Sequence, residues 1–295
     1  MARQIVNFFA ANTKRASPMI ELLGIGSEEA STDEAGIGYR GHGRGAKREE
    51  FTIALAGNLG MGFSKTASCV GHYDGSMRHP CPSGALGKSQ CNDCRQKDIR
   101  NIYTFGNFSK FPEKYASAQK EEYSIYLAQF GEDLLKCGLT KRERLTDRLV
   151  EQGADFGAEI ARFLGPDEAY EAESAIATHF GIQKTITQKA KALRLTFDHS
   201  QAQKHFDAAL FKIRNSKMPL SASFEPLSLG GYYPKISALP IDADFISGSI
   251  AGSKGALVFF LQKNALYSID MKQQVGRTIV ELQSGSRQVQ SRLSL

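Results

Sequence analysis

The middle of the chain changes its hydrophobic period from that of strands to that of a helix. Two apolar runs, "YSIYLAQF" and "LLKCGLT", are separated by the turn formers Gly131-Glu132-Asp133. Short runs of aromatic and aliphatic residues around such a turn predict a β-hairpin. From Arg142 to Gln152 the pattern is that of a helix, and Gly153 is a residue type that ends helices.

A third strand and a second helix follow the hairpin in the same region. The run "AEIARFL" predicts the strand. Gly165-Pro166-Asp167 then opens a helix, because proline at the first helical position loses no hydrogen bond. This helix is expected to reach about Phe180 and to end at Gly181. The predicted order of elements is therefore β, β, α, β, α.

The flanking sequences predict mainly strands and loops. Before the hairpin, the strand-like runs are "IVNFFAA", "PMIELLG" and "FTIALAG", with the Gly-rich basic loop "GIGYRGHGRGAKREE" between the last two. After the module, "SQAQKHFDAALFKIR" predicts a helix, and short strands with Gly turns follow from about Leu220 to the polar tail "SGSRQVQSRLSL". The run "SIAGSKGALVFF" lacks the spacing of a phosphate-binding loop and is interpreted as a turn between strands.

The length and composition of the chain predict more than one small core. Of 295 residues, 41% are hydrophobic. We expect an α+β protein of three parts: a β-rich region with a zinc knuckle at 1–110, the central ββαβα module at 111–185, and a helix followed by a β-rich region at 186–295. No apolar run approaches the roughly 20 residues that span a bilayer, so no membrane partner is expected. The pattern carries no signal for an oligomeric state.

The charge balance favours an anionic partner. Lys and Arg number 37 against 31 for Asp and Glu, which gives a net charge of +6. Between Lys184 and Lys217 only Asp198 and Asp207 are acidic, whereas the basic residues are Lys184, Lys189, Lys191, Arg194, Lys204, Lys212, Arg214 and Lys217. This excess, together with the basic Gly-rich loop, predicts a nucleic-acid partner, DNA or RNA. The alternative is an ordinary solvated surface.

Four of the five cysteines fall in one window without hydrophobic periodicity. Cys69, Cys81, Cys91 and Cys94 have the spacing C-x11-C-x9-C-x2-C, whose last pair can present two thiolates to one tetrahedral ion. We expect a structural zinc site in a reducing cytoplasm, with two disulfides as the alternative in an oxidising compartment. His72 and His79 are alternative ligands. Cys137 stands apart and is expected to be a small buried hydrophobe.

Three separated motifs resemble a family of uncharacterised proteins that carry a domain of unknown function. They are the "CP...QCxxC" segment from Cys81 to Cys94, the "YLAxFG...KxGxT...R...EQGA" segment from Tyr126 to Ala154, and the "GxxxGxKG" piece from Gly248 to Gly255. Within the central module, "SIY" at 124–126, "KCG" at 136–138, an Arg-Leu pair at 148–149 and Glu173 also resemble the GIY-YIG nuclease domain.

The second resemblance implies a phosphodiester site. Tyr126 would come from the first motif strand, Arg148 would clamp the scissile phosphate, and Glu173 would bind one Mg²⁺ or Mn²⁺ ion. Lys136 stands where the nucleases have the tyrosine of the second motif, so the general base would be Tyr126 or Lys136. Such hydrolysis uses a metal and a guanidinium to offset developing negative charge.

Helical periodicity adds an observation about Glu173 that does not depend on the resemblance. Ala169, Ala172, Ile176 and Phe180 form an apolar stripe, and Glu173 lies on the same face. A carboxylate on an inward face needs a metal or a cationic partner. The alternative to a metal is an ion pair with Arg148 or Lys136.

Three functions follow from these patterns. The first is a divalent-metal-dependent nuclease or related phosphodiester enzyme. The second is a zinc-stabilised nucleic-acid-binding protein without cleavage. The third is a GIY-YIG-like pocket adapted to a small-molecule reaction, because a fold does not fix a function. For Arg142, Arg144 and Arg148 the alternative to phosphate binding is a solvated helix face.

Overall fold

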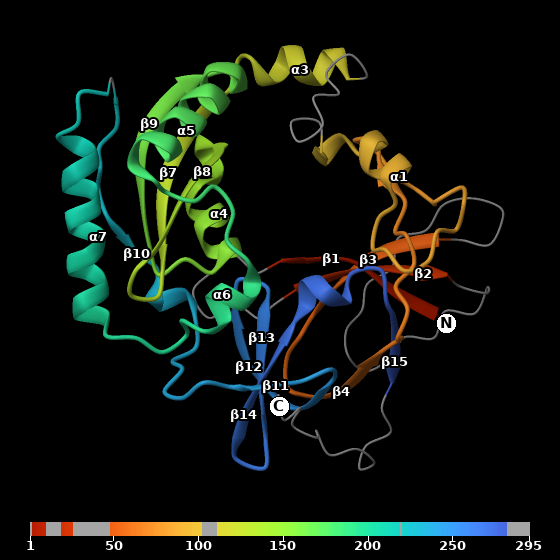
Figure 1. The fold of residues 1–295 in the computed structure, drawn as a ribbon. Helices are drawn as coiled ribbons and strands as arrows, with labels where there is room; N and C mark the ends of the chain where they lie inside the picture. The colour runs from red at the N-terminus through yellow and green to blue at the C-terminus, as the bar shows by residue number, and fades with distance from the viewer. Residues whose placement is uncertain (1, 10–18, 26–47, 102–110, 219, 282–295) are drawn as a thin grey trace.

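The computed structural model describes residues 2–9, 19–25, 48–101, 111–218 and 220–281 (Figure 1). Residues 36–47 of the Gly-rich loop and the polar tail lie outside this part of the chain. The described residues contain helices and strands in a mixed order, which confirms the α+β class. None of the described helices is long and apolar enough to cross a membrane.

The larger sheet joins strands from the two ends of the chain. Its order is β11-β14-β13-β12-β4-β15-β1-β2-β3, antiparallel except for the β11–β14 pair. The early strands are β1 Ala2–Phe9, β2 Met19–Ile25, β3 Arg48–Ala54 and β4 Asn58–Phe63. The late strands are β11 Ile241–Asp242, β12 Ile246–Lys254, β13 Leu257–Gln262, β14 Ala265–Asp270 and β15 Thr278–Glu281.

This sheet makes the first and last predicted regions share one core. Strand β4 lies between β12 and β15, so its position depends on pairing with strands near the other end of the chain. Leu55 packs with Ile246, Phe260 and Met271, and all four are fully buried. The turn predicted in "SIAGSKGALVFF" is confirmed, because β12 ends and β13 begins around Gly255.

A small knuckle precedes the central module. It contains the two-stranded sheet of β5 His72–Tyr73 and β6 Arg78–His79, the helix α1 Asn92–Lys97 and the 3-10 turn η1 Ile99–Asn101. Main-chain hydrogen bonds attach it to the larger sheet: the amide of Ser68 donates to the carbonyl of Gly276 at 2.8 Å, just before β15.

The central module has the predicted ββαβα order. Its elements are β7 Glu122–Phe130, β8 Leu134–Lys141, η3 Arg142–Arg144, α4 Leu145–Gln152, β9 Phe156–Leu164 and α5 Pro166–Phe180, with α3 Pro112–Ala118 before them. Gly153 and Gly181 end their helices with left-handed backbone, as expected. The α-helix begins at Leu145, later than predicted, because Arg142–Arg144 form a 3-10 turn.

The remaining elements connect the module to the larger sheet. They are α6 Gln188–Ala192, α7 His199–Arg214, β10 Leu227–Ser228, η4 Gly230–Tyr232 and η5 Met271–Gln274. The predicted helix α7 is confirmed, and the Asp198 carboxylate caps it by accepting from the amides of Ser200 and Gln201. Strand β10 adds to the edge of the module sheet, whose order is β10-β9-β7-β8.

The two faces of the module sheet have different partners, which decides where each candidate residue lies. On one face Ile125, Leu127 and Cys137 pack with Ile176 of α5 and Phe206 of α7. On the other face, Tyr126, Ala128 and Phe130 pack with Leu149 and Val150 of α4. Because side chains alternate along a strand, neighbours such as Lys136 and Cys137 point to opposite faces.

Candidate functional site

Tyr126 lies at the centre of a small polar network on the α4 face of the module sheet. Its side chain is fully buried. The phenol oxygen accepts a hydrogen bond from the ammonium of Lys136 at 3.2 Å and another from the side-chain amide of Gln152 at 2.5 Å. Tyr126 and Lys136, predicted from two different strands, are therefore brought together, and Gln152 is an additional member of the network.

Gly138 makes this contact sterically feasible. It pairs with Tyr126 across β7 and β8, and a Cβ added at Gly138 would lie 2.4 Å from the Tyr126 ring and 2.6 Å from the Lys136 ammonium nitrogen. Heavy atoms at such distances clash. The glycine of "KCG" thus makes room for the tyrosine of "SIY" and for the lysine two positions before it.

Arg148 lies on α4 and is about half exposed. Its guanidinium pairs loosely with the carboxylate of Glu151, at 3.6 Å. Glu151 pairs more closely with Arg144, at 2.5 Å. Arg142 instead pairs with Glu122 of β7 at 2.7 Å. Of the three arginines predicted to face phosphate, Arg148 has the weakest carboxylate pairing, so it keeps the most capacity to bind an external anion.

Lysines from outside the module approach the same place. Lys191 of α6 donates to the main-chain carbonyl of Gln152 at 2.8 Å and lies 4.1 Å from the centre of the Phe130 ring. Burial, and to a smaller extent the charges of Lys272, Lys136 and Arg148, lower the pKa of Lys191 to about 7. We call Lys136, Arg148, Lys191 and Lys272 the basic cluster.

The fourth member, Lys272, comes from η5 in the last part of the chain. It is exposed, yet the surrounding protein and the charge of Arg148 lower its pKa, while Asp270 and Glu151 act in the opposite direction. The basic cluster therefore collects side chains from β8, α4, α6 and η5. None of the sequence patterns indicated that Lys191 or Lys272 lies beside Arg148, because this proximity depends on the pairing of distant strands.

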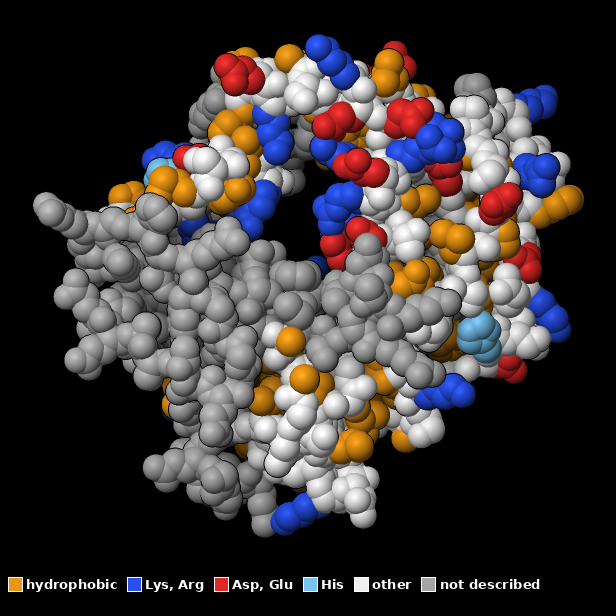
Figure 2. Space-filling view, turned by 180° about the vertical axis from the view of Figure 1, so that it is seen from behind, with side chains coloured by type: hydrophobic (Ala, Val, Ile, Leu, Met, Phe, Trp, Pro, Cys, Tyr) orange, Lys and Arg blue, Asp and Glu red, His pale blue; other side chains and the backbone are white. Residues whose placement is uncertain are grey.

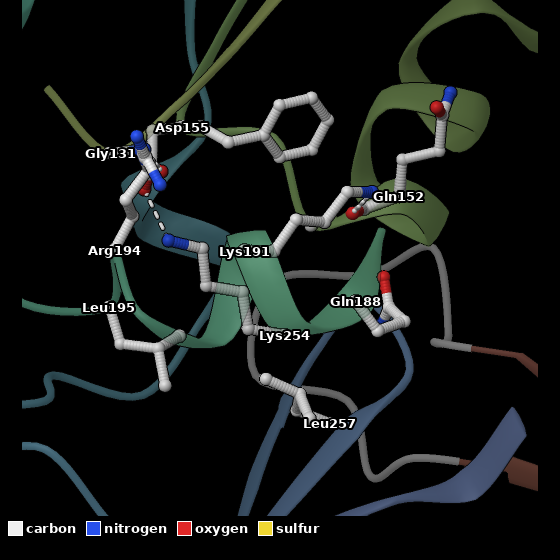
Figure 3. A pocket seen from close by; sticks show the side chains of 11 residues that line it. Gly131, Gln152, Asp155, Gln188, Lys191, Arg194, Leu195, Lys254 and Leu257 are labelled. Carbon is white, nitrogen blue, oxygen red and sulfur yellow. Dashed lines mark hydrogen bonds and ion pairs between the residues drawn. The ribbon is translucent and has the colours of Figure 1, made fainter. Parts of the chain in front are cut away.

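Figure 3 shows the junction at which α6 meets the module and the larger sheet. Lys191 reaches toward Gln152, while Lys254 turns the other way and pairs with Asp155 at 2.6 Å. Asp155 also accepts from the amide of Gly131. Lys254 is thus neutralised by a carboxylate, whereas no carboxylate of the described residues forms an ion pair with Lys191.

The molecule is hollowed at its middle in Figure 2, with Lys, Arg, Asp and Glu side chains along the rim. In Figure 1, β8 and α4 lie on one side of this opening and α1 on the other. Elsewhere in the module, Lys141 pairs with Glu121 at 2.5 Å and Arg142 with Glu122 at 2.7 Å.

Glu173 lies on the other face of the module sheet from Tyr126. It is buried on α5, and its carboxylate pairs with Lys184 at 2.9 Å, not with Arg148 or Lys136 as the ion-pair alternative had it. The main-chain carbonyl oxygen of Glu173 lies 3.8 Å from the sulfur of Cys137. The structure therefore brings Tyr126 and Lys136 together, places Arg148 on the helix that covers the same face, and puts Glu173 on the opposite face. Cys137 is fully buried, as predicted.

A different carboxylate, Glu159 of β9, lies on the Tyr126 face. The strand register pairs it directly with Tyr126, after an irregularity at Ile160. Burial alone would raise the pKa of Glu159, but hydrogen bonds from Arg162 and Ser124 lower it below its usual value. Both of its oxygens are occupied by these partners. The register irregularity that turns Glu159 toward Tyr126 leaves no signal in the hydrophobic pattern.

The four clustered cysteines converge on one point. Their sulfur atoms all lie within 4.8 Å of one another, and Cys81 and Cys91 are 3.8 Å apart. A tetrahedral ion with Zn–S bonds of about 2.3 Å has S–S edges of about 3.8 Å, so the donor set fits zinc. All five cysteines are free thiols, which excludes the disulfide alternative for this structure.

The protein around the sulfurs also suits a cation. Main-chain amides of Gly71 and Cys91 donate to the Cys69 sulfur at 3.4 and 3.2 Å. Burial raises the pKa of the Cys69 and Cys94 thiols, whereas a hydrogen bond from Ser83 lowers that of Cys81 to about 6. His79 instead pairs with Asp74 at 2.6 Å and stacks on His72, so neither alternative ligand belongs to the sulfur group.

Fold and site together define a mixed α and β protein with a four-cysteine metal-type centre and a separate basic cluster. The chain belongs to the family described as "Protein of unknown function (DUF2797)", whose model matches residues 68–279. The match begins beside Cys69 and ends in β15, so it includes the knuckle, the module and the late strands. No curated protein and no solved structure matches the chain.

Proposed function

We propose that this protein binds the phosphate backbone of a nucleic acid through the basic cluster. The observation that carries the proposal is that Lys136, Arg148, Lys191 and Lys272 come from four elements and their charges act on one another, while Glu151 and Asp270 offset only part of that charge. Like charges held together cost free energy, and an anion that binds there recovers it. Phosphate groups of a nucleic acid are anions suited to both lysine and arginine.

Zinc has a structural role in this proposal. Cys69, Cys81, Cys91 and Cys94 would hold it with all four positions occupied by sulfur, which leaves no position for a substrate. Bound zinc would supply folding free energy and no reaction chemistry. Its effect would reach the basic cluster through the Ser68–Gly276 hydrogen bond, since Gly276 follows η5 closely. A reducing compartment such as the cytoplasm suits four free thiols.

Cleavage of the bound strand is a second candidate, favoured by the module itself. The ββαβα order, the contact of Tyr126 with Lys136 and an arginine on the following helix resemble a GIY-YIG-type phosphodiester site. The position of Glu173 favours binding without cleavage over cleavage as the function. Glu173 pairs with Lys184 on the other face of the sheet, so it cannot ligate an Mg²⁺ or Mn²⁺ ion held near Tyr126. Glu159 is on the correct face but is saturated by Arg162 and Ser124.

One experiment separates the two candidates. Labelled single-stranded and duplex DNA, transfer RNA and structured RNA are mixed with the protein, with Mg²⁺, with Mn²⁺ or with a chelator, and binding and product lengths are measured. Retarded but intact strands, lost in Arg148→Gln, support binding alone. Cuts that need the metal and vanish in Glu173→Ala establish the nuclease. A small-molecule function is favoured if none of the four nucleic acids binds at low salt.

A further inference from the structure

The four clustered sulfurs differ in how far they are open to solvent. Cys94 is fully buried on α1 and Cys69 is also buried, whereas Cys81 and Cys91 are only half-buried. The Cys69 sulfur is further enclosed by the main-chain amides of Gly71 and Cys91, which donate to it. A small reagent that arrives from solvent therefore meets Cys81 and Cys91 before the other two sulfurs.

The segment that carries Cys81 lies at the surface of the knuckle. Residues 82–84 are exposed, and a Cβ added at Gly84 would meet nothing within 4 Å, so the chain after Cys81 is loosely surrounded. The sulfurs of Cys81 and Cys91 are 3.8 Å apart. Disulfide-bonded sulfurs are about 2.05 Å apart, so a movement of about 2 Å brings this pair to bonding distance.

We propose that Cys81 and Cys91 are a site of oxidation by hydrogen peroxide, which joins them in a disulfide. The Cys81 sulfur attacks one peroxide oxygen, the O–O bond breaks, and the sulfur becomes a sulfenic acid while the other oxygen leaves as hydroxide. The Cys91 sulfur then attacks the Cys81 sulfur and displaces its hydroxyl group. Two protons, from the thiols or from solvent, convert both leaving groups to water. Two thiols and one peroxide thus give one disulfide and two waters, with two electrons passed from sulfur to oxygen.

The CxxC pair of Cys91 and Cys94 is the chemical competitor. Cys91 is the N-cap of α1 and Cys94 lies within that helix, so a short segment joins them. Peroxide needs access to the sulfur that it oxidises, and Cys94 is 0% exposed. Whichever half-buried sulfur is oxidised first, the other lies 3.8 Å away and is also open to solvent, whereas Cys94 is held in the core of the knuckle. Access therefore favours the pair of Cys81 and Cys91.

Oxidation of this pair removes two of the four donors at once. A tetrahedral ion would keep only Cys69 and Cys94, so zinc should leave. The loosened knuckle carries the Ser68 amide that holds Gly276 near Lys272 of η5. Peroxide should therefore lower the affinity of the basic cluster for nucleic acid. This last step rests on the proposed function, whereas the oxidation site depends on the sulfurs alone.

The test treats the intact zinc-loaded protein with a small excess of hydrogen peroxide and stops samples with catalase. Free thiols are alkylated, the unreduced protein is digested with trypsin, and a coloured chelator reports released zinc. Cleavage after Lys88 places Cys81 in one peptide and both cysteines of the CxxC pair in another. The first disulfide should join these two peptides through Cys91, as fragmentation in the mass spectrometer shows, and zinc should appear at the same rate. Buried Cys137 should stay a thiol, and dithiothreitol with Zn²⁺ should restore the starting protein.

Two histidine variants separate access from the loss of a ligand, because histidine also binds zinc. Cys81→His removes an accessible sulfur, so release of zinc by peroxide should slow at least about tenfold. Cys94→His makes the same change at a buried ligand and should leave the disulfide between Cys81 and Cys91 in place. If either variant does not retain zinc, the peptide map of the wild type decides alone.

The outcomes distinguish the oxidation site from the proposed function. A first disulfide within the CxxC pair, or zinc that stays bound in millimolar peroxide, would overturn the oxidation site. Disulfide formation with zinc release, in a protein whose reduced form binds no nucleic acid, would retain the oxidation site and remove the proposed function. Binding that persists unchanged after complete oxidation would overturn the effect of peroxide on the basic cluster.

Discussion

At the scale of single residues, the contact of Tyr126 with Lys136 depends on the missing side chain of Gly138. The three positions share one face of β7 and β8, and the phenol occupies the space that any larger residue at 138 would need. The Tyr126 phenol also fixes the direction of the Lys136 ammonium, because the ammonium donates a hydrogen bond to the phenol oxygen. A change at Gly138 therefore acts on both stability and charge.

Gly138→Ala should destabilise the protein by about 1–3 kcal/mol, the usual cost of overpacking a core, and should weaken nucleic-acid binding because Lys136 is displaced. Unfolding in urea and anisotropy of a labelled strand measure the two effects. Gly230→Ala is the matched control, because its added Cβ meets only His199, at 3.7 Å. If Gly138→Ala unfolds at the same urea concentration as the wild type, the space between Gly138 and the Tyr126 ring is not as tight as the structure indicates.

The pKa of Lys191 predicts a pH dependence of binding. A bound phosphate favours the protonated amine, so it raises this pKa from about 7, and each binding event takes up protons above that pH. Affinity should be nearly constant below about pH 6 and should fall as the pH rises above 7. Lys191→Arg should remove most of this fall, because arginine stays charged. Titrations at constant ionic strength check both curves, and a flat wild-type curve would contradict the account.

At the scale of elements, the module sheet separates two sets of charged residues that are close in the sequence. Lys136 is on the α4 face, whereas Cys137, next to it, faces Glu173 and α5. The helical stripe correctly indicated that Glu173 is turned inward. It could not indicate which face of the sheet α5 covers, because that depends on how β9 and α5 return across the sheet.

Glu173→Gln should therefore affect stability and spare binding. Loss of the ion pair with half-exposed Lys184 should lower the free energy of unfolding by about 1 kcal/mol. Nucleic-acid affinity should stay within about twofold of wild type, because Glu173 lies on the opposite face from the basic cluster. Arg148→Gln is the comparison variant: it should lower the affinity for nucleic acid and leave the free energy of unfolding nearly unchanged. A large loss of affinity in Glu173→Gln with unchanged stability would place Glu173 in the site after all.

The sequence predicted elements well where the signal is local. The hairpin turn, the terminating glycines and the proline that opens α5 each act within a few residues, and the structure confirms them. The start of α4 was wrong by three residues, because a 3-10 turn has nearly the same pattern as a first helical turn. The convergence of the four cysteines was also predicted, from the close CxxC spacing of Cys91 and Cys94 and the clustering of all four in one window.

At the scale of the whole molecule, the basic cluster exists because the chain ends pair in one sheet. Lys272 reaches the module through η5, and η5 is held in place by β14, β15 and the knuckle. Such contacts join residues far apart in sequence, so patterns along the chain could not predict the cluster. The basic excess at 184–217 predicted an anionic partner but could not predict that the charge of Arg148 acts on Lys191.

Removal of zinc tests this long-range connection. Chelation, or Cys94→Ser, should lower the melting temperature, because chelation removes the cation from the four sulfurs and the substitution removes one of those four donors. Affinity for nucleic acid should also fall several-fold, since Ser68 of the loosened knuckle no longer holds Gly276 beside η5. Re-addition of Zn²⁺ should restore both properties. An unchanged melting temperature together with the absence of zinc in elemental analysis would exclude the structural zinc.

The most direct measurement of the central claim is the salt dependence of nucleic-acid affinity in two variants of equal charge. The first changes Lys136, Arg148, Lys191 and Lys272 to glutamine, and the second changes four exposed lysines, Lys189, Lys204, Lys212 and Lys217. The account predicts that the first binds much more weakly and that its slope against log salt is smaller by about one for each lost phosphate contact, whereas the second stays near wild type. Equal losses in the two variants would show that only net charge matters and would contradict a defined site.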